Sequence, residues 1–116
     1  MSPKSFVRQY RTVVPAGFTT YGLYGSALPA TTRVCYDRIV ACDTNGKPTI
    51  INFGFKRGAD SVNLGSQIPT VVGQGVFVRG KLYVPGDYVP FASFVGVNQD
   101  DVLTLTVYGY TTDTIP

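Results

Sequence analysis

The segment GVFVRGKLYVPGDYVPFASFVGVNQDDVLTLTVYGY, residues 75–110, contains three apolar runs separated by two short turn sequences. In the runs 75–84 and 102–110 apolar and polar residues alternate, which is the pattern of a β-strand with one buried face. The run between them, 88–97, is apolar on both faces, and Pro90 within it favours an edge strand or a bulge. The turn sequences PGD and NQDD contain residues that favour chain reversal. The segment therefore predicts three consecutive strands joined by turns.

Upstream of this segment the chain continues the β pattern. Runs rich in Val, Ile, Phe, Tyr and Thr occupy residues 5–14, 18–28, 33–42 and 48–55. Asn45-Gly46 favours a tight reversal, so 33–55 is the clearest hairpin, whereas the polar stretch 56–69 predicts a loop. The chain contains no Glu, which argues against exposed helices. We expect an all-β fold, an antiparallel β-sandwich of jelly-roll-like topology with about seven or eight strands.

The length of 116 residues suits one domain with a real core, and a hydrophobic content of 44% argues against disorder. Residues 1–11 are polar, basic and poor in core residues, and no acidic residue precedes Asp37. We therefore expect an extended N-terminal arm over 1–11 and a single β-sandwich domain over 12–116. No apolar run approaches the roughly 20 residues that span a bilayer, and no secretory h-region is visible, so a membrane location is not expected.

Cys35 and Cys42 are the two cysteines. On one strand their Cα atoms would lie about 23 Å apart and, at an odd separation, on opposite faces, so a disulfide is not expected unless the segment folds back on itself. The chain has no His, so a zinc site or a Cys–His nucleophile is not expected. We predict that Cys42 is a small core residue and Cys35 a partly buried one, in a protein made in a reducing compartment.

The inventory for catalysis is poor, because both His and Glu are absent. Asp100-Asp101 forms a carboxylate pair, but it lies in a turn without the run of oxygen ligands that calcium needs, so we expect a solvated turn. Gly73-Gln74-Gly75 lacks the Lys-Ser/Thr partner of a phosphate loop. The sequence therefore predicts no enzyme, no catalytic or metal-binding residues and no cofactor.

Basic and aromatic residues instead predict a binding surface. The polar faces of strands 75–84 and 102–110 still carry aromatic rings, and Tyr and Arg are residue types that interfaces favour. Such a face also suits the stacking of bases, but a net charge of +3 is modest and no dense basic stripe occurs, so nucleic acid is disfavoured. We predict contacts with other protein chains, made by Lys4, Arg8, Tyr10, Arg11, Phe77, Arg79, Tyr83, Tyr108 and Tyr110.

Four stretches carry a family resemblance: VPAG at 14–17, RIVACDTNGKPTIINFGF at 38–55, GKLYVPGDYVPFAS at 80–93 and VLTLTVYGY at 102–110. In this order they resemble small β-sandwich virion proteins of tailed bacteriophages, over roughly residues 12 to 110. The matching positions are Pro15, Gly17, Cys42, Asp43, Thr44, Gly46, Leu82, Gly86, Asp87 and Gly109.

The resemblance implies a structural role in the virion, without catalytic residues. It implies a capsid decoration or cement protein on the capsid surface, made in the host cytoplasm. Such a protein binds the major capsid protein, and a homotrimer around a local threefold axis would close its contacts. The alternative is a tail or fibre component that binds a host-surface carbohydrate through the tyrosines Tyr21, Tyr24, Tyr108 and Tyr110.

Overall fold

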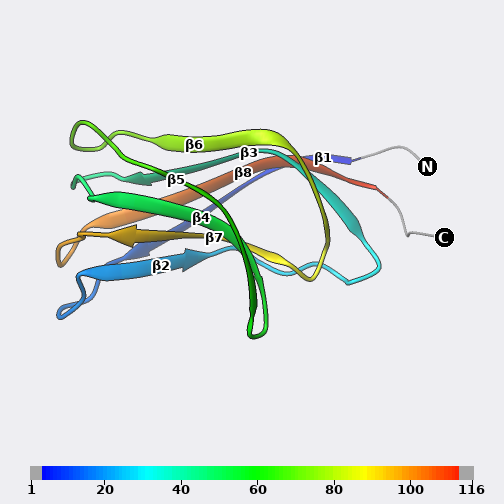
Figure 1. The fold of residues 1–116 in the computed structure, drawn as a ribbon, viewed down its shortest axis with the longest axis horizontal. Helices are drawn as coiled ribbons and strands as arrows, with labels where there is room; N and C mark the ends of the chain where they lie inside the picture. The colour runs from blue at the N-terminus through cyan, green and yellow to red at the C-terminus, as the bar shows by residue number, and fades with distance from the viewer. Residues whose placement is uncertain (1–3, 113–116) are drawn as a thin grey trace.

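The computed structural model describes residues 4–112, which form eight β-strands and no helix (Figure 1). Within this range there is accordingly no helix that could cross a membrane. The strands are β1 (Lys4–Val13), β2 (Thr20–Tyr24), β3 (Arg33–Asp43), β4 (Ile50–Arg57), β5 (Asp60–Gln67), β6 (Val76–Pro85), β7 (Val89–Val95) and β8 (Val102–Thr112).

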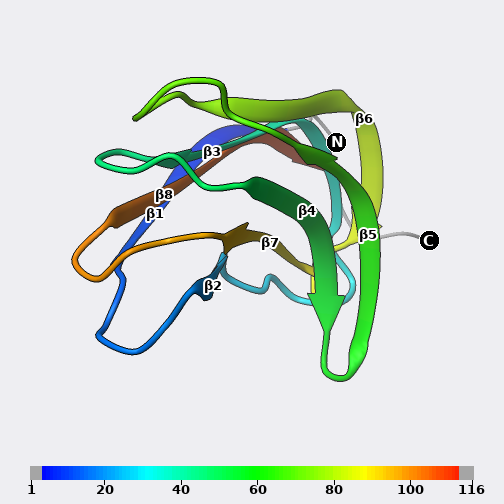
Figure 2. The ribbon, with the colours of Figure 1, turned by 60° about the vertical axis from the view of Figure 1, so that its left-hand side comes forward.

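The strands form two four-stranded sheets, which Figure 2 shows as two packed layers. One sheet has the order β1-β8-β3-β6 and the other β2-β7-β4-β5, and neighbouring strands are antiparallel throughout. Of the eight strands, only β4 and β5 are neighbours both along the chain and within a sheet. Eight antiparallel strands connected in this way form a jelly roll. The prediction of an antiparallel sandwich is confirmed.

The core lies between the two sheets and follows the predicted alternation. On β8, Leu103, Leu105 and Val107 are buried, while Thr104, Thr106 and Tyr108 between and after them are partly exposed. Full burial of one such side chain contributes about 1.5–3 kcal/mol, so an alternating strand is held firmly in register. The largest core side chains from the other strands are Ile39, Ile51, Phe53, Phe55 and Phe94.

The N-terminal segment is part of the sandwich, contrary to the prediction of a separate arm over 1–11. Residues 4–13 form β1, which pairs with β8 from Lys4↔Thr111 to Val13↔Val102. Phe6 and Tyr10 alternate with exposed residues and pack against the core, which gives the segment an inner face. Residues 1–3 lie outside the described range.

The hairpin predicted over 33–55 is also wrong, because β3 and β4 belong to different sheets. Asn45 and Gly46 lie in a loop that crosses between the sheets. Gly46 is required there for space, since a Cβ would lie 2.5 Å from Oδ2 of both Asp43 and Asp101. The true hairpin is β4–β5, whose second strand lies within the stretch 56–69 that was predicted to be a loop.

Both cysteines are free, but their burial is the reverse of the prediction: Cys35 is buried and Cys42 is half-buried. A bulge between Tyr36 and Arg38 shifts the register of β3 by one residue. The two thiols therefore lie on the same face of the sheet. The Cys42 Sγ donates a hydrogen bond to the Gly73 carbonyl at 3.2 Å, and burial raises the pKa of this thiol.

At one end of the sandwich, on the left in Figure 1, four loops between the sheets are tied together by backbone hydrogen bonds. The Val14 N–H donates to the Asp101 carbonyl, and the Asp100 N–H donates to the Val14 carbonyl, both at 2.9 Å. The Gly73 N–H donates to the Gly46 carbonyl at 3.0 Å. These bonds join the β1–β2 loop to the β7–β8 loop and the β3–β4 loop to the β5–β6 loop.

Two carboxyl groups are buried within this loop end. Asp43 is 1% exposed and Asp101 is 4% exposed, whereas Asp100 is the solvated residue that the sequence predicted. Burial raises the pKa of Asp43 to about 7, and the neighbouring carboxyl of Asp101 acts in the same direction. The backbone N–H of Asn98 donates to Oδ2 of Asp101 at 3.0 Å. Oδ2 of Asp43 is buried and has no hydrogen-bond partner within residues 4–112. A proton on Asp43 removes the repulsion of like charges in this space.

Candidate protein-binding face

The outer face of the sheet β1-β8-β3-β6 gathers basic and aromatic side chains. Its residues alternate with core residues along each strand, so they point away from the second sheet. We call this surface the basic-aromatic face and define it by Val7, Arg11, Arg38, Val40, Phe77, Arg79, Tyr83, Tyr108 and Tyr110.

The strand register arranges these residues in rows across the sheet. Val7 lies opposite Tyr108, Tyr108 opposite Arg38, and Arg38 opposite Arg79, so one row runs over all four strands. The next row includes Val40 beside Phe77. Because cross-strand neighbours have Cβ atoms about 5 Å apart, each row is a continuous surface of side chains.

Two arginines of the face lie against aromatic rings. The Arg38 guanidinium is 4.5 Å from the centroid of the Tyr108 ring, and the Arg79 guanidinium is 5.9 Å from that of Phe77. Contacts of this kind contribute about 0.5–1 kcal/mol at exposed sites. They restrict where each guanidinium lies and leave its N–H groups available to a partner.

Tyr83 and Tyr110 meet above the centre of one row. Their hydroxyl oxygens are 3.4 Å apart, and Cys35 lies opposite both residues in the register and is buried. The hydrogen bond to Tyr83 raises the pKa of Tyr110 above its usual range. The pair is therefore a neutral aromatic platform that covers the Cys35 thiol.

The face is positively charged. Arg11, Arg38 and Arg79 are exposed, and none of them makes an ion pair within residues 4–112. Asp37, at the β3 bulge, is the only exposed acidic residue in the four strands of this sheet as far as the described range extends. An acidic partner surface would thus meet uncompensated positive charge.

The structure places six of the nine predicted contact residues on this face: Arg11, Phe77, Arg79, Tyr83, Tyr108 and Tyr110. Lys4 is exposed at the start of β1. Arg8 and Tyr10 lie on the opposite side of β1, half-buried. Tyr10 packs against the core, and the Arg8 guanidinium lies 5.1 Å from the centroid of the Phe6 ring.

Sequence reasoning missed Val7, Arg38 and Val40 as members of the face. Arg38 follows the β3 bulge, which reverses the side on which later residues emerge. Val7 lies in the weakly alternating run 5–14, but residues 1–11 were also predicted to form an arm outside the sandwich. Pairing of β1 with β8 is what brings it beside Tyr108.

The tyrosines of the carbohydrate alternative do not come together. Tyr108 and Tyr110 lie on β8, whereas Tyr21 and Tyr24 lie on β2 in the other sheet. The Tyr21 ring packs against Phe18 at 5.1 Å between centroids. Over residues 4–112 no three His, Cys, Asp or Glu side chains are grouped so as to hold a metal ion.

The sequence matches no protein-family model and no curated protein. Among solved structures, the chain is similar to a chain in the structure of infectious bursal disease virus, Gt strain. The identity is 11% and the TM-score 0.40, and the match covers 94% of this chain and 31% of the viral chain. For the structure of the Gx strain the identity is 12% and the TM-score 0.46, and the match covers 96% of this chain and 32% of the viral chain. For the VP2 subviral particle of this virus the identity is 11% and the TM-score 0.35, and the match covers 98% of this chain and 42% of the VP2 chain. The chain thus spans less than half of each of these chains, and TM-scores below 0.5 carry no conclusion about its function.

Proposed function

We propose that this chain is a structural virion protein that decorates and stabilises a capsid by binding major capsid protein subunits through the basic-aromatic face. The observation that supports the proposal is the continuous row structure of Tyr, Arg, Phe and Val on an open sheet. Interfaces are enriched in Tyr and Arg, which bury large areas at a small entropic cost. The sequence resemblance to phage virion β-sandwiches points to the same role.

Electrostatics favour an acidic partner. The chain carries a net charge of +3, and three arginines of the face have no carboxylate partner within residues 4–112. Such a surface accelerates the encounter with an acidic one and rejects a basic one. The binding free energy then comes from the aromatic platform, which is rigid before binding because it rests on a β-sheet.

Immunogold electron microscopy of particles from a lysate tests the location, with an antibody raised against this chain. We expect label over the heads. Label confined to the tails would contradict capsid decoration and would direct attention to adsorption. A complete lack of labelled particles would contradict a virion role altogether.

Co-sedimentation with particles assembled without this chain tests the face itself. Arg38→Glu combined with Arg79→Glu is expected to weaken binding by about thirtyfold or more, because a central interface arginine contributes about 2 kcal/mol. Lys47→Glu combined with Lys56→Glu changes the net charge equally, at exposed positions away from the face, and should leave binding nearly intact. Equal losses in the two double variants would mean that net charge, and not this face, controls binding.

A further inference from the structure

The jelly roll is open along one side, where the edge strands β5 and β6 of the two sheets run past each other without pairing. A groove of about 500 Å³ lies between them. We call it the β5–β6 groove. Its apolar floor consists of Phe55, Leu64, Leu82 and Val84, and its rim carries Arg57 and Lys81.

The floor is continuous with the core. Phe55 is buried, and its ring centroid lies 5.1 Å from that of Tyr36. Leu64, Leu82 and Val84 are only half-buried and pack against the core cluster. An apolar side chain that entered the groove would therefore complete their burial and be released from water itself.

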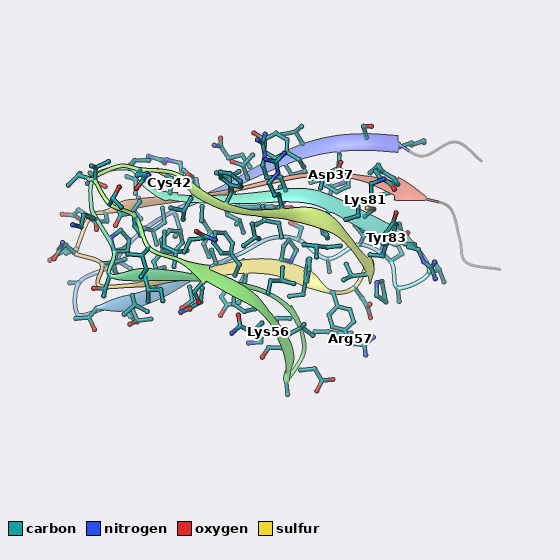
Figure 3. All side chains as sticks on the ribbon, turned by 45° about the horizontal axis from the view of Figure 1, so that its top comes forward. Asp37, Cys42, Lys56, Arg57, Lys81 and Tyr83 are labelled. Atoms are coloured by element: carbon teal, nitrogen blue, oxygen red, sulfur yellow. The ribbon has the colours of Figure 1, made fainter. Side chains whose placement is uncertain are left out.

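The rim carries one uncompensated positive charge, on Lys81, and an ion pair between Arg57 and Asp87. The Arg57 guanidinium lies 4.5 Å from the centroid of the Tyr88 ring and 3.6 Å from Oδ2 of Asp87, so it is held in place. Lys81 is exposed and makes no ion pair within residues 4–112. Figure 3 shows Lys81 and Tyr83 of β6 on one side and Arg57 at the end of β4 on the other. An occupant with acidic side chains suits this rim.

The backbone of β6 offers a further set of contacts. From Leu82 to Pro85 its pairing with β3 is regular, down to Arg33↔Pro85, and its other edge faces no strand within residues 4–112. Upstream, Gly80 has a φ of 133° and lies where the pairing with β3 is interrupted, so the regular edge begins after it. Pro85 has no N–H, and its carbonyl already accepts a hydrogen bond from the Tyr88 N–H at 3.1 Å, so the free groups of this edge lie before Pro85. Free N–H and C=O groups on a strand edge bind an extended segment as an added strand.

We propose that the β5–β6 groove binds an extended segment of a partner protein that adds to the edge of β6. Alternate apolar side chains of this segment fill the groove, and acidic side chains between them lie against Lys81 and Arg57. Strand addition explains the three observations together: an unpaired edge, an apolar floor beside it and a basic rim. The groove is separate from the residues that define the basic-aromatic face, except that Tyr83 borders both, so the proposal goes beyond the capsid contact.

NMR titration of the full ¹⁵N-labelled chain with three synthetic octapeptides tests this. The first alternates leucine with aspartate, the second has lysine in place of aspartate, and the third contains the residues of the first in two blocks. We expect the first peptide to shift amide resonances of β5 and β6 and to protect from hydrogen exchange the amides among residues 81–84 that point away from β3. The lysine peptide and the block peptide should bind at least about tenfold more weakly.

Variants locate the effect. Lys81→Glu should weaken binding of the aspartate peptide about five- to tenfold, whereas Lys47→Glu, at the loop end, should not. Val62→Trp should occlude the groove. Val62 lines the β5 side of the groove and is 49% exposed, so the larger Trp ring at this position fills the space. Absence of shifts in β5 and β6, equal binding of the three peptides, or shifts without added amide protection would each overturn the proposal. None of these results bears on the Arg38 and Arg79 test of the proposed function.

Discussion

Among single residues, Asp43 makes the stability of the protein depend on pH, because its carboxyl is buried beside that of Asp101. The pKa of Asp43 is raised from 3.8 to about 7, so between these values the folded protein holds a proton that the unfolded chain releases. The folded state then binds more protons, and stability falls as pH rises. The stabilisation is fully present below about pH 4 and is lost as pH rises through 7.

We therefore expect the free energy of unfolding to decrease between pH 5 and pH 8, by at most about 1.4 kcal/mol per pH unit for one proton. Asp43→Asn keeps the shape of the group without its titration and should flatten this slope. Urea denaturation at pH 5, 6, 7 and 8 measures it. Asp100→Asn is the matched control, because Asp100 is exposed in the same loop and Asn tolerates its φ of 70°. An unchanged slope in Asp43→Asn would show that Asp43 does not hold this proton.

This carboxyl pair was not predictable from the sequence. The sequence Asp100-Asp101 is typical of a solvated turn, but only Asp100 is exposed to solvent, whereas Asp101 is buried. Asp101 is drawn inward because strands β3 and β8 are neighbours, which places the end of one beside the start of the other. The requirement for glycine at position 46 was not predictable either. It arises because a Cβ there would clash with the two carboxyl groups, whose position the sequence does not reveal.

At the element scale, β1 decides whether residues 1–11 can be removed without damage to the fold. As a free arm they would be dispensable, but β1 pairs with β8 along its length and packs Phe6 against the core, with its ring 5.9 Å from that of Tyr36. Its loss would uncover the edge of β8. Deletion of 1–11 is therefore a poor test of partner binding, because it alters the sheet.

Single substitutions in β1 separate its two faces. Phe6→Ala should lower the free energy of unfolding by about 1–3 kcal/mol, less than the loss for a fully buried Phe because Phe6 is only half-buried. The adjacent Val7→Ala, at a side chain that is 63% exposed, should change it by less than about 0.5 kcal/mol. Chemical denaturation of both variants measures the contrast. Equal small effects would mean that β1 does not contribute to the core in solution.

The strands that the sequence predicted well, such as β6 and β8, are those in which apolar and polar residues alternate strongly. Such an alternation with a period of two residues fits a β-strand with one buried face and does not fit a helix. β5 was missed since an edge strand is largely exposed and its sequence DSVNLGSQ is polar. The pairing of strands was not accessible either. Asn45-Gly46 favours a chain reversal, but the same turn sequence can join two strands of one sheet or two strands of different sheets. Here it joins β3 and β4, which lie in different sheets.

At the scale of the whole molecule, the jelly-roll topology assembles a surface from distant segments. Arg38 and Tyr108 are 70 positions apart in the sequence, yet they are direct neighbours because β8 lies between β1 and β3. The composition predicted that Tyr and Arg would form an interface, but only the strand order determines which of them share a face. The same order leaves β5 and β6 as edges and so creates the groove.

The loop end presents apolar side chains that a homotrimer would cover. Ile68, Val71 and Val72 in the β5–β6 loop are 66%, 58% and 66% exposed. Exposed apolar groups clustered in this way mark contacts between chains, and a closed ring of three subunits buries one such patch per subunit. We expect sedimentation equilibrium of the unmodified chain to give three times the monomer mass of 12.5 kDa.

Val71→Asp combined with Val72→Asp should then dissociate the trimer, because it places two charges in the subunit contact. Val7→Asp, an equally apolar-to-acidic change on the basic-aromatic face, should leave the mass unchanged and weaken only the binding to capsids. A monomer mass for the unmodified chain would contradict the trimer. A trimer that survives the double substitution would place the subunit contact elsewhere on the molecule, and dissociation by Val7→Asp would mean that the basic-aromatic face joins copies of this chain to each other and not to a capsid.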